Sequence, residues 1–314
     1  MNAVIDWQHT MEAAETRLRA AELAPDLDAA IAAATDAVKQ FRDALDLARV
    51  ADTPLDWAAT HTRLAVALRL LGALVDDGVM LQDAIRSAQA ALSVAPLATA
   101  PQVWGRALAA LGSVYVVLGE RDGDLAALAE AAACYAEALE GFPGQNFPVD
   151  RARMLRNRGA ALSLLGEVAN DPDALSDAIG CYRAALEAYS PDATQADWVL
   201  THSNLGHALR LLGEQTGDIR RLTEAVEACE VALAAVAAET APQEWAMTAT
   251  NFGNALAALG AHAGDADALQ RAVAVYRQAV AALSGPRWLR QRAIARHNLA
   301  RAEEKLAALG ATAE

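Results

Sequence analysis

Five arginines offer the clearest recognition chemistry in this sequence, and that chemistry is the binding of carboxylates. A guanidinium group is planar and always charged, and it donates two parallel hydrogen bonds to a carboxylate. The chain that carries these arginines is acidic, with 40 Asp and Glu residues against 26 Lys and Arg and a net charge of −14. The five residues, selected by the spacing described below, are Arg69, Arg106, Arg153, Arg156 and Arg210.

Residue patterns for catalysis or metal binding are absent from the sequence. His202 and His207 are five residues apart, whereas a metal-binding pair on one helix face is four apart, and no HExxH motif occurs. No phosphate-binding loop, GxSxG motif or paired-carboxylate arrangement is present. The three cysteines, an odd number, form neither a disulfide framework nor a CxxC metal site. We therefore expect no enzyme activity, no metal and no cofactor.

Composition narrows the partner classes further. Hydrophobic residues make up 54% of the chain but aromatic residues only 5%, because alanine supplies much of the apolar content and indicates close helix packing. A net charge of −14 disfavours nucleic acid and anionic membranes as partners. The first residues lack the basic and apolar regions of a signal peptide, and no run of eighteen apolar residues suggests membrane insertion. We expect a cytoplasmic protein.

One period of 47 residues organises the chain. Such a fixed period is typical of stacked supersecondary units, each too small to bury its apolar face alone. Tryptophans at 57, 104, 198 and 245 follow the same grid. The two columns that define it contain glycine (Gly72, Gly119, Gly166, Gly213, Gly260) and aspartate (Asp77, Asp124, Asp171, Asp218, Asp265).

Within each repeat the apolar spacing is helical, at steps of three, four or seven residues, as in Leu205, Leu209 and Leu212. The glycine column is expected to end the first helix of each repeat at the left-handed C′ position. The aspartate column is expected to cap the second helix rather than to bind metal, since its members belong to different repeats. Both helices should be about 18 residues long, with connections of about five.

These signals predict an all-α fold, a right-handed α-solenoid of about 13 helices in antiparallel pairs. The whole chain, 1–314, is expected to be one solenoid. A divergent helix pair occupies 1–54, and a final helix caps the array at 286–310. Between them lie five repeats, at 55–95, 102–142, 149–189, 196–237 and 243–283.

Column by column, the repeat resembles the tetratricopeptide repeat (TPR), whose pattern has a small residue in the first helix and two alanines in the second. Asn204-Leu205-Gly206 is close to the usual Asn-Leu-Gly of that family. The match covers about residues 55–308 and is carried by three columns. These are the small column (Ala65, Gly112, Gly159, Gly206, Gly253, Ala300) and the two alanine columns (Ala84, Ala131, Ala178, Ala225, Ala272 and Ala91, Ala138, Ala185, Ala232, Ala279).

The repeat departs from the family in length, because the usual period is about 34 residues. In this respect it resembles the long-helix TPR arrays of bacteria and, more distantly, the kinesin light chain type. The resemblance implies a protein-binding scaffold or adaptor that holds an extended segment against the concave face, along one stripe of the first helices. In this chain the stripe has four positions in each repeat, counted from a column that contains asparagine at 157, 204, 251 and 298. Two positions lie four residues and one residue before that column, and two lie three and six residues after it.

The stripe carries five arginines and no carboxylate in its twenty positions. We therefore expect it to bind an acidic segment or a free C-terminus of a partner protein, with affinity that falls as salt rises. The predicted peptide-binding residues are Arg69, Arg106, Arg153, Arg156, His207, Arg210 and Asn254. Two alternatives are that the arginines pair with acids on neighbouring helices, and that they line a face with no ligand.

Repeat three carries two further arginines in apolar columns. Arg151 replaces the tryptophan, and Arg158 replaces a leucine or phenylalanine. A buried, unpaired charge is costly, so Arg158 is expected to reach water or a carboxylate. A role in supporting the stripe arginines is the alternative. The asparagine column is expected to bond the backbone of the adjoining repeat, and the tryptophan column to pack between repeats.

The sequence is also compatible with two other functions. Residues 1–56 carry 11 acids and 5 bases, whereas residues 284–314 carry 6 bases and 3 acids. Ends of opposite charge could dock head to tail, which is the heterologous contact of rings and filaments, so self-association is one alternative. A sensor of a small ligand or signalling peptide is the other, and it predicts compaction on binding.

Overall fold

The computed structural model describes residues 2–48, 53–143, 146–284 and 288–312. Within these ranges it contains thirteen α-helices and one short 3-10 helix, and no strand, which confirms the predicted all-α fold class. The chain divides into two compact units, residues 1–161 and 162–314, with the division inside one helix, α7 (Pro148–Val168). Each unit is described separately.

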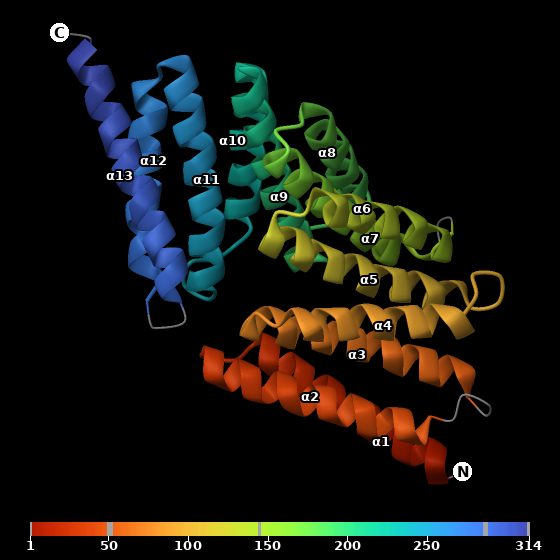
Figure 1. Cartoon of the computed structure of the whole chain (residues 1–314). Helices are drawn as coiled ribbons and strands as arrows, with labels where there is room; N and C mark the ends of the chain where they lie inside the picture. The colour runs from red at the N-terminus through yellow and green to blue at the C-terminus, as the bar shows by residue number, and fades with distance from the viewer. Residues whose placement is uncertain (1, 49–52, 144–145, 285–287, 313–314) are drawn as a thin grey trace. The chain divides into compact units, whose positions relative to one another are not determined.

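In the first unit, successive helices pack against each other as antiparallel neighbours, and α3 also contacts α5 (Figure 1). Its helices are α1 (Asn2–Glu22), α2 (Leu27–Leu47), α3 (Pro54–Val75), α4 (Gly78–Val94), α5 (Pro101–Asp122) and α6 (Leu125–Ala138), followed by the 3-10 helix η1 (Leu139–Gly141) and the start of α7. The divergent N-terminal pair predicted before the repeats is therefore α1 and α2.

The second unit contains the end of α7 and six further helices. In it α9 packs on α10 and α11, and α11 packs on α12 and α13. The predicted final helix corresponds to α13, although residues 286 and 287 lie outside the described residues. The six helices are α8 (Pro172–Leu186), α9 (Gln195–Thr216), α10 (Ile219–Ala234), α11 (Pro242–Ala263), α12 (Ala266–Ala282) and α13 (Leu289–Thr312).

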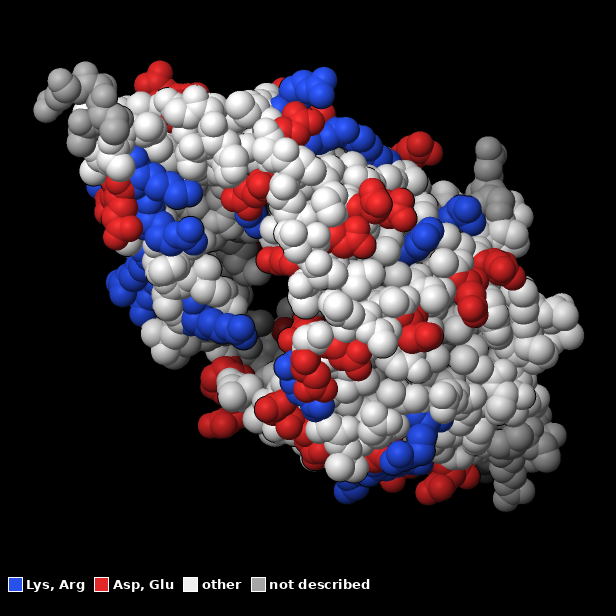
Figure 2. Space-filling model, turned by 45° about the horizontal axis from the view of Figure 1, so that its top comes forward, with Lys and Arg blue, Asp and Glu red and all other residues white. Residues whose placement is uncertain are grey.

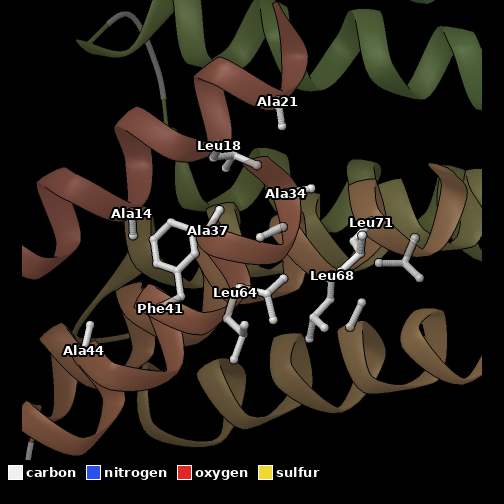
Figure 3. Close-up of a cluster of buried hydrophobic side chains, with 14 of the residues drawn as sticks. Ala14, Leu18, Ala21, Ala34, Ala37, Phe41, Ala44, Leu64, Leu68 and Leu71 are labelled. Atoms are coloured by element: carbon white, nitrogen blue, oxygen red, sulfur yellow. The ribbon is translucent and has the colours of Figure 1, made fainter. Parts of the chain in front are cut away.

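Small side chains allow the helices of each unit to approach closely. In the first unit, Phe41 of α2 is fully buried among alanines of α1 and α2 and leucines of α3, including Leu64 and Leu68 (Figure 3). In the second unit, Trp245 packs against apolar residues of α9, α10 and α12. This contact is the inter-repeat packing expected of the tryptophan column.

The aspartate column caps the second helix of each pair, as predicted. Asp77, Asp124, Asp171, Asp218 and Asp265 each precede a helix, and each side chain accepts a hydrogen bond from at least one backbone N–H of the first turn. Each such cap stabilises its helix by about 1 kcal/mol. The caps determine where α4, α6, α8, α10 and α12 begin.

The role predicted for the glycine column is wrong. Each first helix continues past its glycine, so that α3 ends at Val75 rather than near Gly72. The left-handed residue that ends the helix is four positions after the glycine, with φ of 52° at Asp76 and 69° at Gly217. As a result α3, α5, α9 and α11 are 22 residues long, and only two residues connect each to its partner instead of about five.

The glycine column serves close helix contact instead. A Cβ atom added at Gly260 would lie 2.7 Å from Leu269 Cγ and 2.9 Å from the Asp265 carbonyl oxygen. The same leucine and aspartate columns face Gly72, Gly166 and Gly213. Because real Cβ atoms do not approach other atoms this closely, only glycine lets the two helices meet at this point.

By length and composition, α3 is the one described helix apolar enough to cross a membrane, with a mean hydropathy of 1.2 over its best window. Half of that window is buried inside the protein, against α2, α4 and α5. This burial is the environment of a core helix.

Substituting Gly260 and Gly180 by alanine should have opposite effects on stability. Gly260→Ala should lower the free energy of unfolding by about 1–3 kcal/mol, since the added methyl group meets the α12 backbone. Gly180→Ala, in α8 where no atom lies within 4 Å of the added Cβ, should raise it by about 0.5–1 kcal/mol. Urea unfolding followed by circular dichroism measures both. Equal stabilisation by the two substitutions would contradict the close-contact role.

Candidate functional site

Five of the seven predicted binding residues line two cavities, one in each unit. Arg69, Arg106 and Arg153 line a cavity of the first unit, and Arg210 and Asn254 line a cavity of the second. Arg156 and His207 line neither of these cavities. The two cavities are named the first-unit groove and the second-unit pocket.

The first-unit groove has a volume of about 1010 Å³ and is walled by α1, α3, α5 and α7. Eight of its residues belong to the stripe predicted from the repeat: Ala59, Thr62, Val66, Arg69, Arg106, Ala109, Ser113 and Arg153. Apolar side chains from three walls complete it, among them Trp7, Met11 and Met154. The helical period therefore brings most of the predicted stripe of the first three repeats to one cavity.

The groove also contains carboxylates that the sequence analysis did not place there. Its four acidic residues are Glu12, Glu15, Glu22 and Asp150, and its four basic residues are Arg63, Arg69, Arg106 and Arg153. The formal charges cancel, so the groove is mixed in charge rather than purely basic. Three of the acids come from α1, whose sequence does not follow the 47-residue grid, and the repeat columns therefore gave no signal for them.

Two of the groove arginines are already paired. Arg63 Nε lies 3.1 Å from Glu15 Oε1, and Arg153 Nη1 lies 3.5 Å from Asp150 Oδ1. Both pairs are about half exposed, where an ion pair contributes little to stability. Of these two residues only Arg153 belongs to the predicted stripe, and its partner Asp150 lies on the same helix, α7, rather than on a neighbouring helix.

Arg69 and Arg106 differ from Arg63 and Arg153, which are each paired with an acid. Arg106 is exposed and forms no ion pair with any residue that the structure describes. Arg69 is half-buried, and its buried Nε atom has no hydrogen-bond partner among the residues that the structure describes. Burial lowers the pKa of the Arg69 guanidinium, while Tyr135, Glu22 and Glu120 act in the opposite direction. These two arginines are the groove cations best placed to meet a ligand.

The other arginines of repeat three lie beside the groove. Arg156 is half-buried, and its Nη2 donates to Asn157 Oδ1 at 3.4 Å. Arg158 is also half-buried, and its Nε makes no hydrogen bond within the described ranges. The carboxylate partner expected for Arg158 therefore stays a prediction.

In the second unit, Arg210 is held by its neighbours along α9. Its Nη1 pairs with Glu214, and its Nη2 lies 3.3 Å from His207 Nδ1. The other ring nitrogen of His207 lies 3.6 Å from Glu167 Oε2. The interaction with His207 lowers the pKa of the Glu167 carboxyl, with a smaller contribution from the charge of Arg210. His207 thus contacts Arg210 and is not part of the lining of the second-unit pocket.

The second-unit pocket has a volume of about 210 Å³ and lies among α9, α11, α12 and α13. Arg210, Glu214 and Asn254 line it together with four residues that the sequence analysis missed: Tyr276, Asn298, Arg301 and Lys305. The period itself contained a signal for Arg301, which is 47 residues after Asn254 and so continues the stripe into α13.

Two of the four asparagines, Asn251 and Asn298, bond a side chain of the preceding pair rather than its backbone as predicted. Asn251 Nδ2 donates to Ser203 Oγ at 2.7 Å, and Asn298 Nδ2 donates to Asn254 Oδ1 at 2.8 Å. These bonds join α9 to α11 and α11 to α13. These two asparagines therefore help to position α9, α11 and α13 relative to one another.

Titratable groups elsewhere in the chain offer little chemistry. Burial raises the pKa of the Cys134 and Cys229 thiols to about 12, so both are protonated at neutral pH. Across the described residues, no group of three or more His, Cys, Asp or Glu side chains is arranged to hold a metal ion.

Replacing His207 by asparagine should raise the pKa of Glu167 toward that of an ordinary glutamate, because the largest cause of its depression is removed. Since the folded-state pKa is depressed, the contribution of Glu167 to stability is present above the ordinary glutamate pKa and is lost as pH falls through the folded value. A carbon-detected NMR titration of the Glu167 carboxyl in both proteins measures the change. An unchanged pKa would show that His207 does not interact with Glu167 in solution.

No protein-family model matches the sequence, and no curated protein matches it either. Solved structures do match. The structure is similar to the crystal structure of BtubC (BKLC) from P. vanneervenii, with a TM-score of 0.53 and 20% identity over 83% of this chain and 95% of that one. Lower TM-scores relate it to the yeast Sti1 TPR2AB domain in complex with pHSP90 (0.28, 14% identity, 94% and 99% covered) and to yeast Tom70 (0.32, 15% identity, 88% and 60% covered). At 20% identity, the similarity to BtubC is one of fold, an array of paired α-helices.

Proposed function

We propose that this chain is a non-enzymatic scaffold or adaptor that binds an acidic segment of a partner protein in the first-unit groove. The observation that carries the proposal is the convergence of eight predicted stripe residues on one cavity. Among the residues that the structure describes, Arg106 of this cavity has no ion-pair partner and Arg69 Nε has no hydrogen-bond partner.

The size and lining of the groove fit a peptide segment. At about 1010 Å³ it reaches the upper end of the range of about 300–1,000 Å³ typical of small-molecule sites. Trp7 and Val103, which are half-buried, offer apolar surface for side chains, and the arginines offer bidentate donors for carboxylates. Because packed helices form the groove in advance, most of the ordering cost of binding falls on the peptide.

The α1 carboxylates refine the expected ligand. Glu12 and Glu22 line the same groove and would repel a long run of acidic residues. A segment with one short acidic stretch beside apolar or basic residues would pair with the groove arginines without placing further acidic residues next to the α1 carboxylates. This charge pattern distinguishes the proposal from nonspecific attraction between a basic surface and any acidic chain.

Selection of short random peptides displayed on phage, against the purified chain, tests the proposed groove. The selected peptides should be enriched in Asp or Glu next to apolar residues. A synthetic copy of the best peptide should bind the Arg69→Gln/Arg106→Gln protein about 10-fold more weakly or worse, since each charge-assisted hydrogen bond contributes about 1.5–3 kcal/mol. Fluorescence anisotropy at two salt concentrations measures the affinity, which should fall with salt.

The matched control is Arg42→Gln/Arg86→Gln, which removes the same charge from exposed positions of α2 and α4 outside the groove. Arg106→Gln alone is a second test, because its exposed side chain is not needed for packing. Equal weakening by the control and the groove variant would refute groove binding. Selection of peptides without acidic residues would refute the acidic preference alone.

A further inference from the structure

Positive charge gathers around the second-unit pocket, although the chain as a whole is acidic. Three cations line the pocket, Arg210, Arg301 and Lys305, against one carboxylate, that of Glu214. The formal charge of the lining is therefore +2. Basic side chains are concentrated along α13 in the space-filling view (Figure 2), and two of the three cations come from that helix.

Hydrogen-bond donors of the pocket are oriented before any ligand binds. Tyr276 Oη donates to Asn254 Oδ1 at 2.6 Å, and Asn298 Nδ2 donates to the same oxygen at 2.8 Å. With its oxygen occupied twice, Asn254 has its amide N–H groups left to offer to a ligand. Burial raises the pKa of Tyr276, so its hydroxyl stays protonated and keeps this arrangement at neutral pH.

Arg210 adds a donor that the protein leaves unused. Its side chain is only 15% exposed, and its pairing with Glu214 and contact with His207 fix the two terminal nitrogens. Its Nε atom is buried and has no hydrogen-bond partner in the described part of the chain. A buried donor without an acceptor is costly, which indicates that an acceptor belongs nearby.

We propose that the second-unit pocket binds a phosphate group. A volume of about 210 Å³ is enough to admit one phosphate group. A phosphate monoester carries a charge of about −1.5 to −2 at pH 7 and three acceptor oxygens, which match a lining charge of +2 and several converging donors. A single carboxylate has one negative charge and two oxygens, so it would neutralise only part of the lining charge and accept from only some of the donors. The proposal is independent of peptide binding in the first-unit groove.

Isothermal titration calorimetry of the full chain tests the pocket with four ligands. Inorganic phosphate and a phosphoserine peptide represent the two sources of a phosphate group, and acetate and the same peptide without phosphate are the comparisons. We expect binding of at least one phosphate ligand and at least 10-fold weaker binding of both comparisons. Binding of inorganic phosphate alone would show that the pocket binds the free ion. Tighter binding of the phosphoserine peptide would show that the pocket binds a phosphorylated side chain. Either result supports the phosphate assignment.

Two variants locate that binding. Arg301→Gln removes an exposed cation, and Asn254→Asp keeps the acceptor oxygen for Tyr276 and Asn298 but replaces the free N–H groups with an oxygen. Each should weaken phosphate binding at least 10-fold while leaving the circular dichroism spectrum unchanged. Arg296→Gln, an exposed charge on the same helix outside the pocket lining, should change it less than about 2-fold.

Three results would overturn the proposal. They are no phosphate binding by the wild-type chain, acetate binding as tight as that of phosphate, and equal weakening by Arg296→Gln and Arg301→Gln. The last result would mean that α13 attracts anions by its overall charge and that the pocket forms no site. Failure of the first-unit groove to select peptides has no bearing on these outcomes, because the two sites share no residue.

Discussion

The close contact between the two helices of each pair is the constraint on which the rest of the structure depends. Glycine in the first helix meets leucine in the second at a distance that no Cβ atom tolerates, and fully buried alanines such as Ala84 and Ala225 extend the contact along the helices. This contact turns the same face of each first helix outward from its partner. Some residues one period apart consequently line the same cavity, as Arg106 and Arg153 do in the first unit and Asn254 and Arg301 in the second.

The charge of each cavity differs from the net negative charge of the whole chain and depends on which residues line that cavity. The first-unit groove balances its arginines with carboxylates of α1 and α7, whereas the second-unit pocket keeps an excess of cations next to a single glutamate. Ion pairs such as that of Arg63 and Glu15 position side chains and contribute little stability, because they are half exposed. Among the described residues, Arg69 and Arg210 each keep a buried Nε without a hydrogen-bond partner, and Arg106 forms no ion pair.

The helix pairs and the aspartate caps could be predicted from the sequence because a cap depends on a side chain and its next three residues. The end of each first helix could not. Glycine is common both at left-handed C′ positions and at close helix contacts, and the two uses look alike in a sequence. The left-handed position is four residues further on, where Asp76 and Asn170 occupy it in two of the pairs.

The candidate sites were predictable only as far as the period extends. Repetition placed Arg69, Arg106 and Arg153 at one groove and could have placed Arg301 at the pocket, one period after Asn254. It had no information on Glu12, Glu15 and Glu22, because α1 lies outside the grid. It also could not show that Arg153 pairs with Asp150, since that depends on side-chain conformation.

A crystal structure of the chain bound to its tightest selected peptide tests the central claim most directly. We expect the peptide to lie in the first-unit groove, with a carboxylate within hydrogen-bond distance of Arg106 or Arg69 and an apolar side chain against Trp7. A peptide bound on α2 or α4, with both arginines left free, would contradict it.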